Sequence, residues 1–149
     1  MIEFRRMARI EVQIAAAALR AAVEALHRAF PRHSWTGIYF LRGDELVLGP
    51  FVGPPTKHVR IPRGRGLCGR AVREETDLNV GDVASQPEYL ACSAEVRSEL
   101  IVLVRDRGEI VGQIDIDSRQ AGAFPPDHER AVRGVADALA PLVRVARDS

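Results

Sequence analysis

The stretch ELIVLVRDRGEIVGQIDID, residues 99–117, decides the fold. Its two apolar runs, 99–104 and 109–117, flank residues 106–108 (Asp-Arg-Gly), a composition typical of a turn. Apolar runs on either side of such a turn predict an antiparallel β-hairpin. The rest of the chain can be assigned outward from this hairpin.

Further strand-like segments lie upstream of the hairpin. Residues 35–41 and 46–51 flank a second turn composition at 42–45, and shorter apolar runs occupy 59–61 and 78–83. These segments predict additional strands of the same sheet.

Helical patterns lie at both ends of the chain and once between the strands. Residues 7–30 carry apolar side chains near helical spacing, and residues 125–147 begin with two prolines and an aspartate, as first helical turns often do. A shorter helix is expected at 67–74, and 85–96 is expected to be irregular or a short helix. This order predicts an α+β fold, an antiparallel sheet with helices packed mainly on one face.

The first helix is rich in alanine, which allows close packing. Two interpretations remain open. The helix covers the core of its own chain, or it packs against a partner helix from a second subunit.

Composition excludes several classes of protein. A chain of 149 residues suits one compact domain, and its 46% hydrophobic and 28% charged residues are ordinary for a globular protein. With 21 basic and 20 acidic residues the net charge is +1, so nucleic acid is not expected as a partner. No signal peptide and no run long enough for a membrane span are recognised. We therefore expect a cytoplasmic protein with reduced thiols.

The two cysteines are candidate reactive groups. Cys92 lies outside any periodic apolar pattern, although a lone cysteine is most often a small buried apolar residue. Cys68 opens the expected 67–74 helix with three arginines nearby, an environment that would stabilise a thiolate. The alternative for Cys68 is a loop cysteine without a function.

Three carboxylates could gather on one face of the sheet. Asp115 and Asp117 are two apart in a strand and project side by side, roughly 7 Å apart. Glu99 begins the partner strand of the hairpin and can join them. In a pocket, such a cluster would raise the pKa of its members and could supply a proton or bind an ammonium group. The alternative is a solvated outer face.

Trp35 and Tyr39 are four apart on the first strand and share a face. They could pack in the core or form an aromatic wall for an apolar or sulfur-containing ligand.

No metal site is expected. The separations of His58, Cys68 and Cys92 match no zinc signature. The other histidines are expected at the surface: His27, His33 and His128.

Taken together, several blocks resemble the signature blocks of the free methionine-(R)-sulfoxide reductases, which are stand-alone GAF-domain enzymes. The blocks are Trp35 to Tyr39, Leu48 to Gly53, Val59 to Gly69, Ala91-Cys92, Ser98-Glu99 and Asp115 to Ser118. The resemblance covers the chain from about Trp35 to Phe124.

The resemblance implies a GAF-like fold for the whole chain. Helices at the two ends would pack on one face of a central antiparallel sheet, and loops with a short helix would form a pocket on the other. Residues 1–149 would form a single domain, comprising the N-terminal helix (1–32), the sheet and pocket loops (33–124) and the C-terminal helix (125–149).

The resemblance also implies a reaction. A cysteine at Cys92 would attack the sulfur of free methionine sulfoxide, release methionine and become a sulfenic acid. Cys68 would condense with it to a disulfide, which a thioredoxin-type or glutathione-type reductant would then reduce. No cofactor is implied, and a homodimer is compatible with the alanine-rich helix.

The site residues implied by the family fall on the candidates named above. Catalytic positions correspond to Cys92, Cys68, Glu99 and Asp115, and substrate-binding positions to Trp35, Tyr39, Asp117, Glu99 and Asp115. Two positions depart from the family pattern: His58 replaces a cysteine common in the family, and Leu103 replaces a proline. The alternative function is a GAF-type sensor that binds a small ligand without turnover.

Overall fold

A computed structural model of the chain describes residues 1–87, 89 and 94–149. In these ranges one antiparallel sheet of six strands runs in the order β3-β2-β1-β6-β5-β4. The strands are β1 (His33–Arg42), β2 (Glu45–Val52), β3 (Arg60–Pro62), β4 (Leu78–Val80), β5 (Ser98–Asp106) and β6 (Glu109–Ser118). The hairpin expected from residues 99–117 is thus formed by β5 and β6, two inner strands of the sheet.

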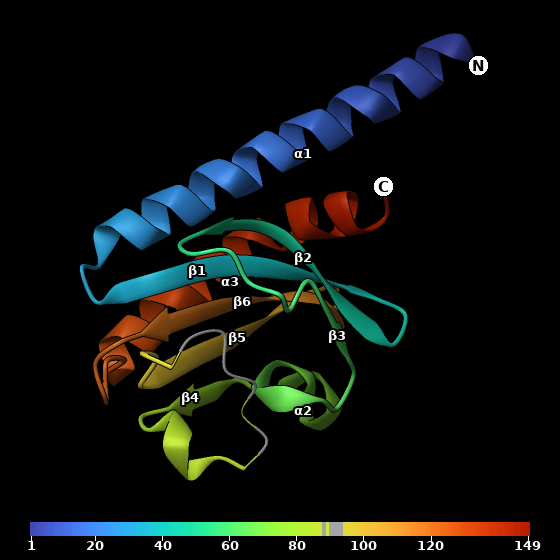
Figure 1. Ribbon diagram of the computed structural model, residues 1–149. Coiled ribbons are helices and arrows are strands. Elements are labelled where there is room, and N and C mark those ends of the chain that lie inside the picture. Colours follow the sequence, from blue (N-terminus) through green and yellow to red (C-terminus); the bar gives the residue numbers. More distant parts are fainter. Residues whose placement is uncertain (88, 90–93) are drawn as a thin grey trace.

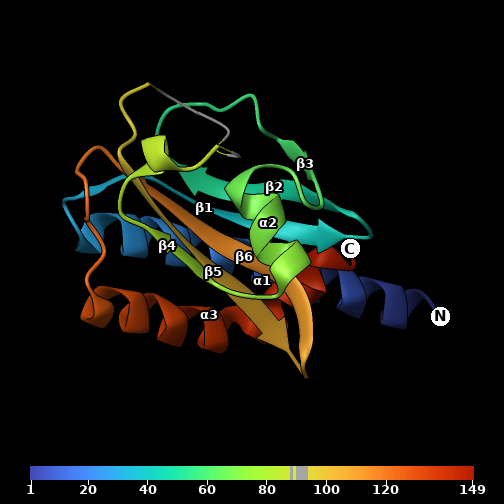
Figure 2. The same ribbon diagram turned by 90° about the horizontal axis from the view of Figure 1, so that it is seen from below.

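Helices cover the two faces of the sheet unequally (Figures 1 and 2). The long helices α1 (Ile2–Ala29) and α3 (Pro126–Arg147) lie on one face, whereas α2 (Gly66–Glu74) and the short 3₁₀ helix η1 (Val83–Ser85) lie on the other. The α+β arrangement expected from the sequence, an antiparallel sheet with the two terminal helices on one face (Figure 1), is confirmed. In the part of the chain that is described, no helix has the length and apolar character to cross a membrane.

Strand alternation divides the interior into two clusters, one on each face of the sheet. On the α1 and α3 face, Ile38, Val102 and Ile114 are among the buried residues that pack against the helices. On the α2 face, Trp35 and Ile101 belong to a second cluster. The polar residues of interest lie on this second face, because they share the odd-numbered positions of β1, β5 and β6.

Two sequence expectations about helices and histidines are wrong. The first helix begins at Ile2 rather than Met7, because charged residues such as Arg5 and Arg6 are good helix formers that need no apolar stripe. His33 and His128 are each 6% exposed rather than at the surface, and their Nε2 atoms lie 2.8 Å apart. His27 is half-buried, and its Nδ1 lies 3.0 Å from Thr36 Oγ1.

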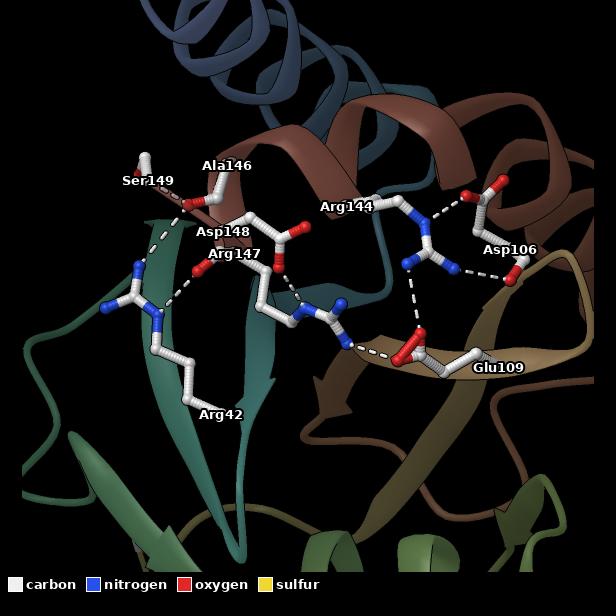
Figure 3. Close-up of polar contacts among 8 residues, drawn as sticks. All are labelled: Arg42, Asp106, Glu109, Arg144, Ala146, Arg147, Asp148 and Ser149. Carbon is white, nitrogen blue, oxygen red and sulfur yellow. Dashed lines mark hydrogen bonds and ion pairs between the residues drawn. The ribbon is translucent and has the colours of Figure 1, made fainter.

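A charged network fastens the end of α3 to the turns of two hairpins (Figure 3). Arg144 contacts both Asp106 and Glu109 beside the β5–β6 turn, and Arg147 also contacts Glu109. Arg42, at the end of β1, donates to the carbonyl oxygens of Ala146 and Arg147. The network holds α3 along the sheet at the end of the β5–β6 hairpin opposite to Glu99 and Asp117.

Candidate functional site

The strand register brings the predicted site residues into adjacent rows on the α2 face of the sheet. In one row Trp35 of β1 pairs with Asp117 of β6, which in turn pairs with Glu99 of β5. In the next row Asp115 lies between Gly37 and Ile101. The expectation that Glu99 joins the two aspartates on one face is confirmed in its geometry.

The three carboxyl groups are almost completely removed from water. Glu99 is 5% exposed, Asp115 2% and Asp117 1%. The alternative of a solvated outer face is therefore wrong, because α2 and the neighbouring loops cover this side of the sheet. One carboxylate oxygen each of Asp115 and Asp117 is buried without a hydrogen-bond partner among the described residues.

Burial and mutual repulsion raise the pKa values of these acids. Burial, followed by the charges of Asp115 and Asp117, raises the pKa of Glu99 well above its ordinary value. Burial and the charge of Asp115 do the same to the pKa of Asp117. Burial also raises the pKa of Asp115, but hydrogen bonds with Glu99 and Cys68 oppose that rise. The cluster therefore retains its protons to a higher pH than isolated carboxyl groups do.

Cys68 lies in the first turn of α2 and faces the acids. Its thiol donates to Asp115 Oδ2 at 3.4 Å, and the thiol sulfur and one oxygen each of Glu99 and Asp115 lie within 4.8 Å of one another. Burial, then the charges of Asp115, Glu99 and Asp117, raises the pKa of the Cys68 thiol well above its ordinary value. The expected thiolate is wrong, because burial and the charges of the three carboxyl groups disfavour the ionised form of this thiol.

Two cavities meet the acid cluster from different sides. One is lined by Tyr39, His58 and Cys68 together with Glu99 and Asp115. The other is lined by residues that include Trp35 and Asp117. Each of the three carboxyl residues thus lines one of these two cavities.

Aromatic rings form one wall beside the acids. The ring centroids of Trp35 and Tyr39 are 6.2 Å apart, and Phe51 stacks on Trp35 at 5.6 Å. The Tyr39 hydroxyl donates to the carbonyl oxygen of His58 at 2.8 Å, which ties the loop before β3 to β1. Gly37 makes room for this wall, since a Cβ at that position would overlap the Trp35 ring. The shared face predicted for Trp35 and Tyr39 is confirmed.

Cys92 lies outside the described residues, as do residues 88, 90, 91 and 93 of the segment 85–96 that was expected to be irregular or a short helix. Its relation to the acid cluster therefore stays a prediction.

One site residue was missed by sequence reasoning. Gln113 is fully buried and pairs with Tyr39 across β1 and β6, and its Nε2 donates to the carbonyl oxygen of Cys68 at 3.1 Å. A signal was present, because Gln113 precedes Asp115 by two residues and so shares its face of the strand. Gln113 fixes the first turn of α2 over the sheet.

Comparisons with known proteins point to one family. The GAF domain family model matches residues 11–144. The structure is similar to that of the type II free methionine-R-sulfoxide reductase from Thermoplasma acidophilum, with 41% identity and a TM-score of 0.87 over 89% of this chain and 94% of that one. It is also similar to the free methionine-R-sulfoxide reductase from Neisseria meningitidis in complex with its substrate, with 31% identity and a TM-score of 0.81 over 97% and 90% of the two chains.

A curated relative agrees with these structures. The free methionine-R-sulfoxide reductase of Escherichia coli is 40% identical over 100 residues, which are 67% of this chain. The aligned part spans 60% of the length of that relative.

Proposed function

Since the chain belongs to the GAF-domain family and, within it, to the free methionine-R-sulfoxide reductases, we propose that it reduces free methionine-R-sulfoxide to methionine. The observation that carries the proposal is the buried Cys68 thiol beside the carboxyl groups of Glu99 and Asp115 in one cavity, with the buried Asp117 paired to Glu99 in the same cluster. The reaction needs both kinds of group.

The carboxyl groups can supply the proton that the reaction needs. The oxygen of a sulfoxide is a poor leaving group, so its departure requires a proton donor at that oxygen. Glu99 suits this task, because its raised pKa favours the protonated form. We assign the proton delivery to Glu99, which lines the same cavity as the Cys68 thiol.

The thiols supply the two electrons. Cys92 attacks the sulfoxide sulfur, the sulfoxide oxygen passes to the cysteine, and methionine leaves while Cys92 becomes a sulfenic acid. Cys68 then attacks the sulfenic sulfur, a disulfide forms, and the oxygen leaves as water. A dithiol of the thioredoxin type, or glutathione, reduces the disulfide back to two thiols and is itself oxidised.

The surroundings of Cys68 favour the second of these steps over the first. A thiol with a raised pKa is a poor first nucleophile at neutral pH. Asp115, which accepts the hydrogen bond from the Cys68 thiol, can take its proton when the sulfenic acid is attacked. Cys68 is therefore the resolving thiol and Asp115 its base.

The remaining site residues bind the substrate. Asp117 and its neighbours offer negative charge to the α-ammonium group of a free amino acid. Trp35 and Tyr39 contact the methyl group on sulfur.

The proposal is tested with the purified full-length protein, a dithiol reductant and the two epimers of free methionine sulfoxide, with methionine measured by chromatography. We expect the R epimer to be reduced and the S epimer to be spared, and Cys92→Ser to abolish turnover. Glu99→Gln should lower kcat by roughly 10²- to 10⁴-fold through loss of the proton donor.

Glu95→Gln is the matched control for the Glu99 variant. Glu95 has a side chain that is 64% exposed and pairs with Arg119 at the surface, so its variant should keep the original kcat. Equal rates for both epimers, or an unchanged kcat for Glu99→Gln, would contradict the proposal. Binding of the sulfoxide without turnover would instead favour the sensor interpretation.

A further inference from the structure

Cys68, Glu99 and Asp115 bring three possible metal ligands close together in one cavity. The thiol sulfur and one oxygen of each carboxyl group all lie within 4.8 Å of one another. The residues come from α2, β5 and β6, so no short ligand spacing links them in the sequence. The expectation of no metal site considered only His58, Cys68 and Cys92, and it therefore did not cover this group.

The separation of two of these atoms fits a Zn²⁺ site. Zn²⁺ binds thiolate sulfur at about 2.3 Å and carboxylate oxygen at about 2.1 Å, which puts two such ligands of a tetrahedral site roughly 3.6 Å apart. Cys68 Sγ and Asp115 Oδ2 are 3.4 Å apart. A mixed set of sulfur and oxygen ligands also favours Zn²⁺ over Mg²⁺ and Ca²⁺, which prefer oxygen alone.

Two features of the cluster indicate that it can accept a cation. The Asp115 side chain is 2% exposed, and its Oδ1 atom has no hydrogen-bond partner among the described residues. No basic side chain in that part of the chain lowers the pKa of Glu99 or of Asp115, both of which burial raises. Buried carboxylates are normally paired with a cation or bound to a metal. A divalent ion would give Asp115 Oδ1 a partner and neutralise the negative charge of the cluster.

We propose that Cys68, Glu99 and Asp115 bind Zn²⁺, and that the bound ion reversibly blocks the reduction of methionine sulfoxide. Binding of the ion does not depend on the proposed function, whereas its effect on turnover rests on it. A bound metal ion favours the thiolate and carboxylate forms, so the protons of Cys68 and Glu99 pass to the solvent. Glu99 then has no proton to deliver, and Cys68, bound through its sulfur, cannot attack a sulfenic acid.

The first experiment measures binding apart from activity, with Cd²⁺ as an optical probe of the site. The Cys92→Ser variant keeps Cys68 as its sole thiol, so an ultraviolet charge-transfer band between thiolate and Cd²⁺ reports on Cys68. We expect this band to saturate at one equivalent of Cd²⁺ and to disappear when Zn²⁺ displaces the probe. Absence of the band would by itself overturn the proposal.

Variants in the Cys92→Ser background test the two carboxyl ligands. Glu99→Gln and Asp115→Asn should each raise the dissociation constant of Cd²⁺ at least about tenfold, because each removes a charged ligand. Asp137→Asn is the matched control, since Asp137 has a side chain that is 63% exposed on α3, and it should leave the constant unchanged. Circular dichroism checks that each variant is folded. A folded Glu99→Gln or Asp115→Asn variant with unchanged affinity would exclude that residue as a ligand and overturn the three-residue site.

The second experiment measures inhibition in a single turnover without added reductant, because dithiols bind Zn²⁺ themselves. One equivalent of Zn²⁺ should slow methionine release from free methionine-R-sulfoxide at least about tenfold, and the chelator EDTA should restore it. The Cys68→Ser variant, compared with itself in the absence of the ion, should need at least about tenfold more Zn²⁺ for the same suppression. Equal sensitivity of the two proteins to Zn²⁺ would overturn the proposed inhibition.

Failure of this proposal and failure of the proposed function give different results. A protein that releases no methionine even without Zn²⁺ would contradict the proposed function alone, because the Cd²⁺ titration needs no turnover. A protein that releases methionine but shows no thiolate–Cd²⁺ band would contradict the metal site alone.

Discussion

At the scale of single residues, the main feature of the site is the cost of burying three acids together. A carboxyl group removed from water favours its neutral form, and a charged neighbour adds to that preference. This cost applies to Glu99, Asp115 and Asp117, because they are buried and lie in adjacent rows of the sheet. Such groups titrate as a unit, and the protons they hold are shared among them. A cluster of this kind is suited to delivering a proton and to receiving a cation.

Asp117→Asn should weaken binding of the substrate more than it slows the reaction. Loss of the negative charge removes its attraction for the ammonium group, and we expect KM to rise about tenfold or more while kcat changes only a few-fold. Steady-state kinetics with free methionine-R-sulfoxide measure both values. Asp137→Asn on the exposed side of α3 is the control and should change neither. An unchanged KM for Asp117→Asn would remove Asp117 from this role.

Cys68→Ser should separate the two thiol steps. When free methionine-R-sulfoxide is added without reductant, the unmodified protein should lose two free thiols as its disulfide forms. The Cys68→Ser variant should lose one thiol and release a single equivalent of methionine, because Cys92 would still be oxidised to the sulfenic acid. Thiol titration and mass spectrometry measure the outcome. A loss of only one thiol in the unmodified protein would exclude Cys68 as the resolving cysteine.

At the scale of secondary structure, the sequence predicted the strands well because period-two alternation was visible. The hairpin of β5 and β6, the shared face of Trp35 and Tyr39, and the gathering of the acids all followed from that alternation. Burial of the acids did not follow, because an alternating strand with polar residues looks the same whether the second face meets water or another layer. The positions of His33 and His128 depend on how α1, β1 and α3 meet, which no local pattern encodes.

His33 should make stability depend on pH. Burial, then the nearby His128 and His27, lowers the pKa of His33 from 6.5 to about 4. Between pH 4 and pH 6.5 the unfolded chain binds this proton more strongly than the folded chain does. The free energy of unfolding therefore rises with pH in this window and levels off above it. At pH 5 His33 should reduce the free energy of unfolding by about 2 kcal/mol relative to pH 7.5.

Urea unfolding at the two pH values measures this effect. His33→Gln should remove most of the difference, whereas the control His58→Gln should keep it, because His58 lies on the opposite face of the sheet from the histidine cluster. A His33→Gln variant with the same pH dependence as the unmodified protein would contradict the assignment.

At the scale of the whole molecule, the two faces of the sheet differ in the residues that they bury. The face under α1 and α3 carries the larger hydrophobic cluster together with the buried histidines, whereas the face under α2 holds the acids, the thiol and the cavities. Unfavourable burial of polar groups is tolerated on one side because apolar burial on the other offsets it. Variants of the α2 face should therefore remain folded more often than equally drastic variants of the α1 and α3 face.

The position of Trp35 in the cavity wall affects what the fluorescence of the protein reports. Trp35 is the sole tryptophan of the chain, and its ring lies 4% exposed beside Asp117 with an indole N–H that has no partner among the described residues. All indole emission of the protein therefore originates from the wall of this cavity. With the inactive Cys92→Ser variant, titration of free methionine-R-sulfoxide should shift or quench this emission in a saturable way, and Asp117→Asn should move the midpoint to higher concentration. A spectrum that stays constant at saturating ligand would mean that the indole is not in contact with the occupied cavity.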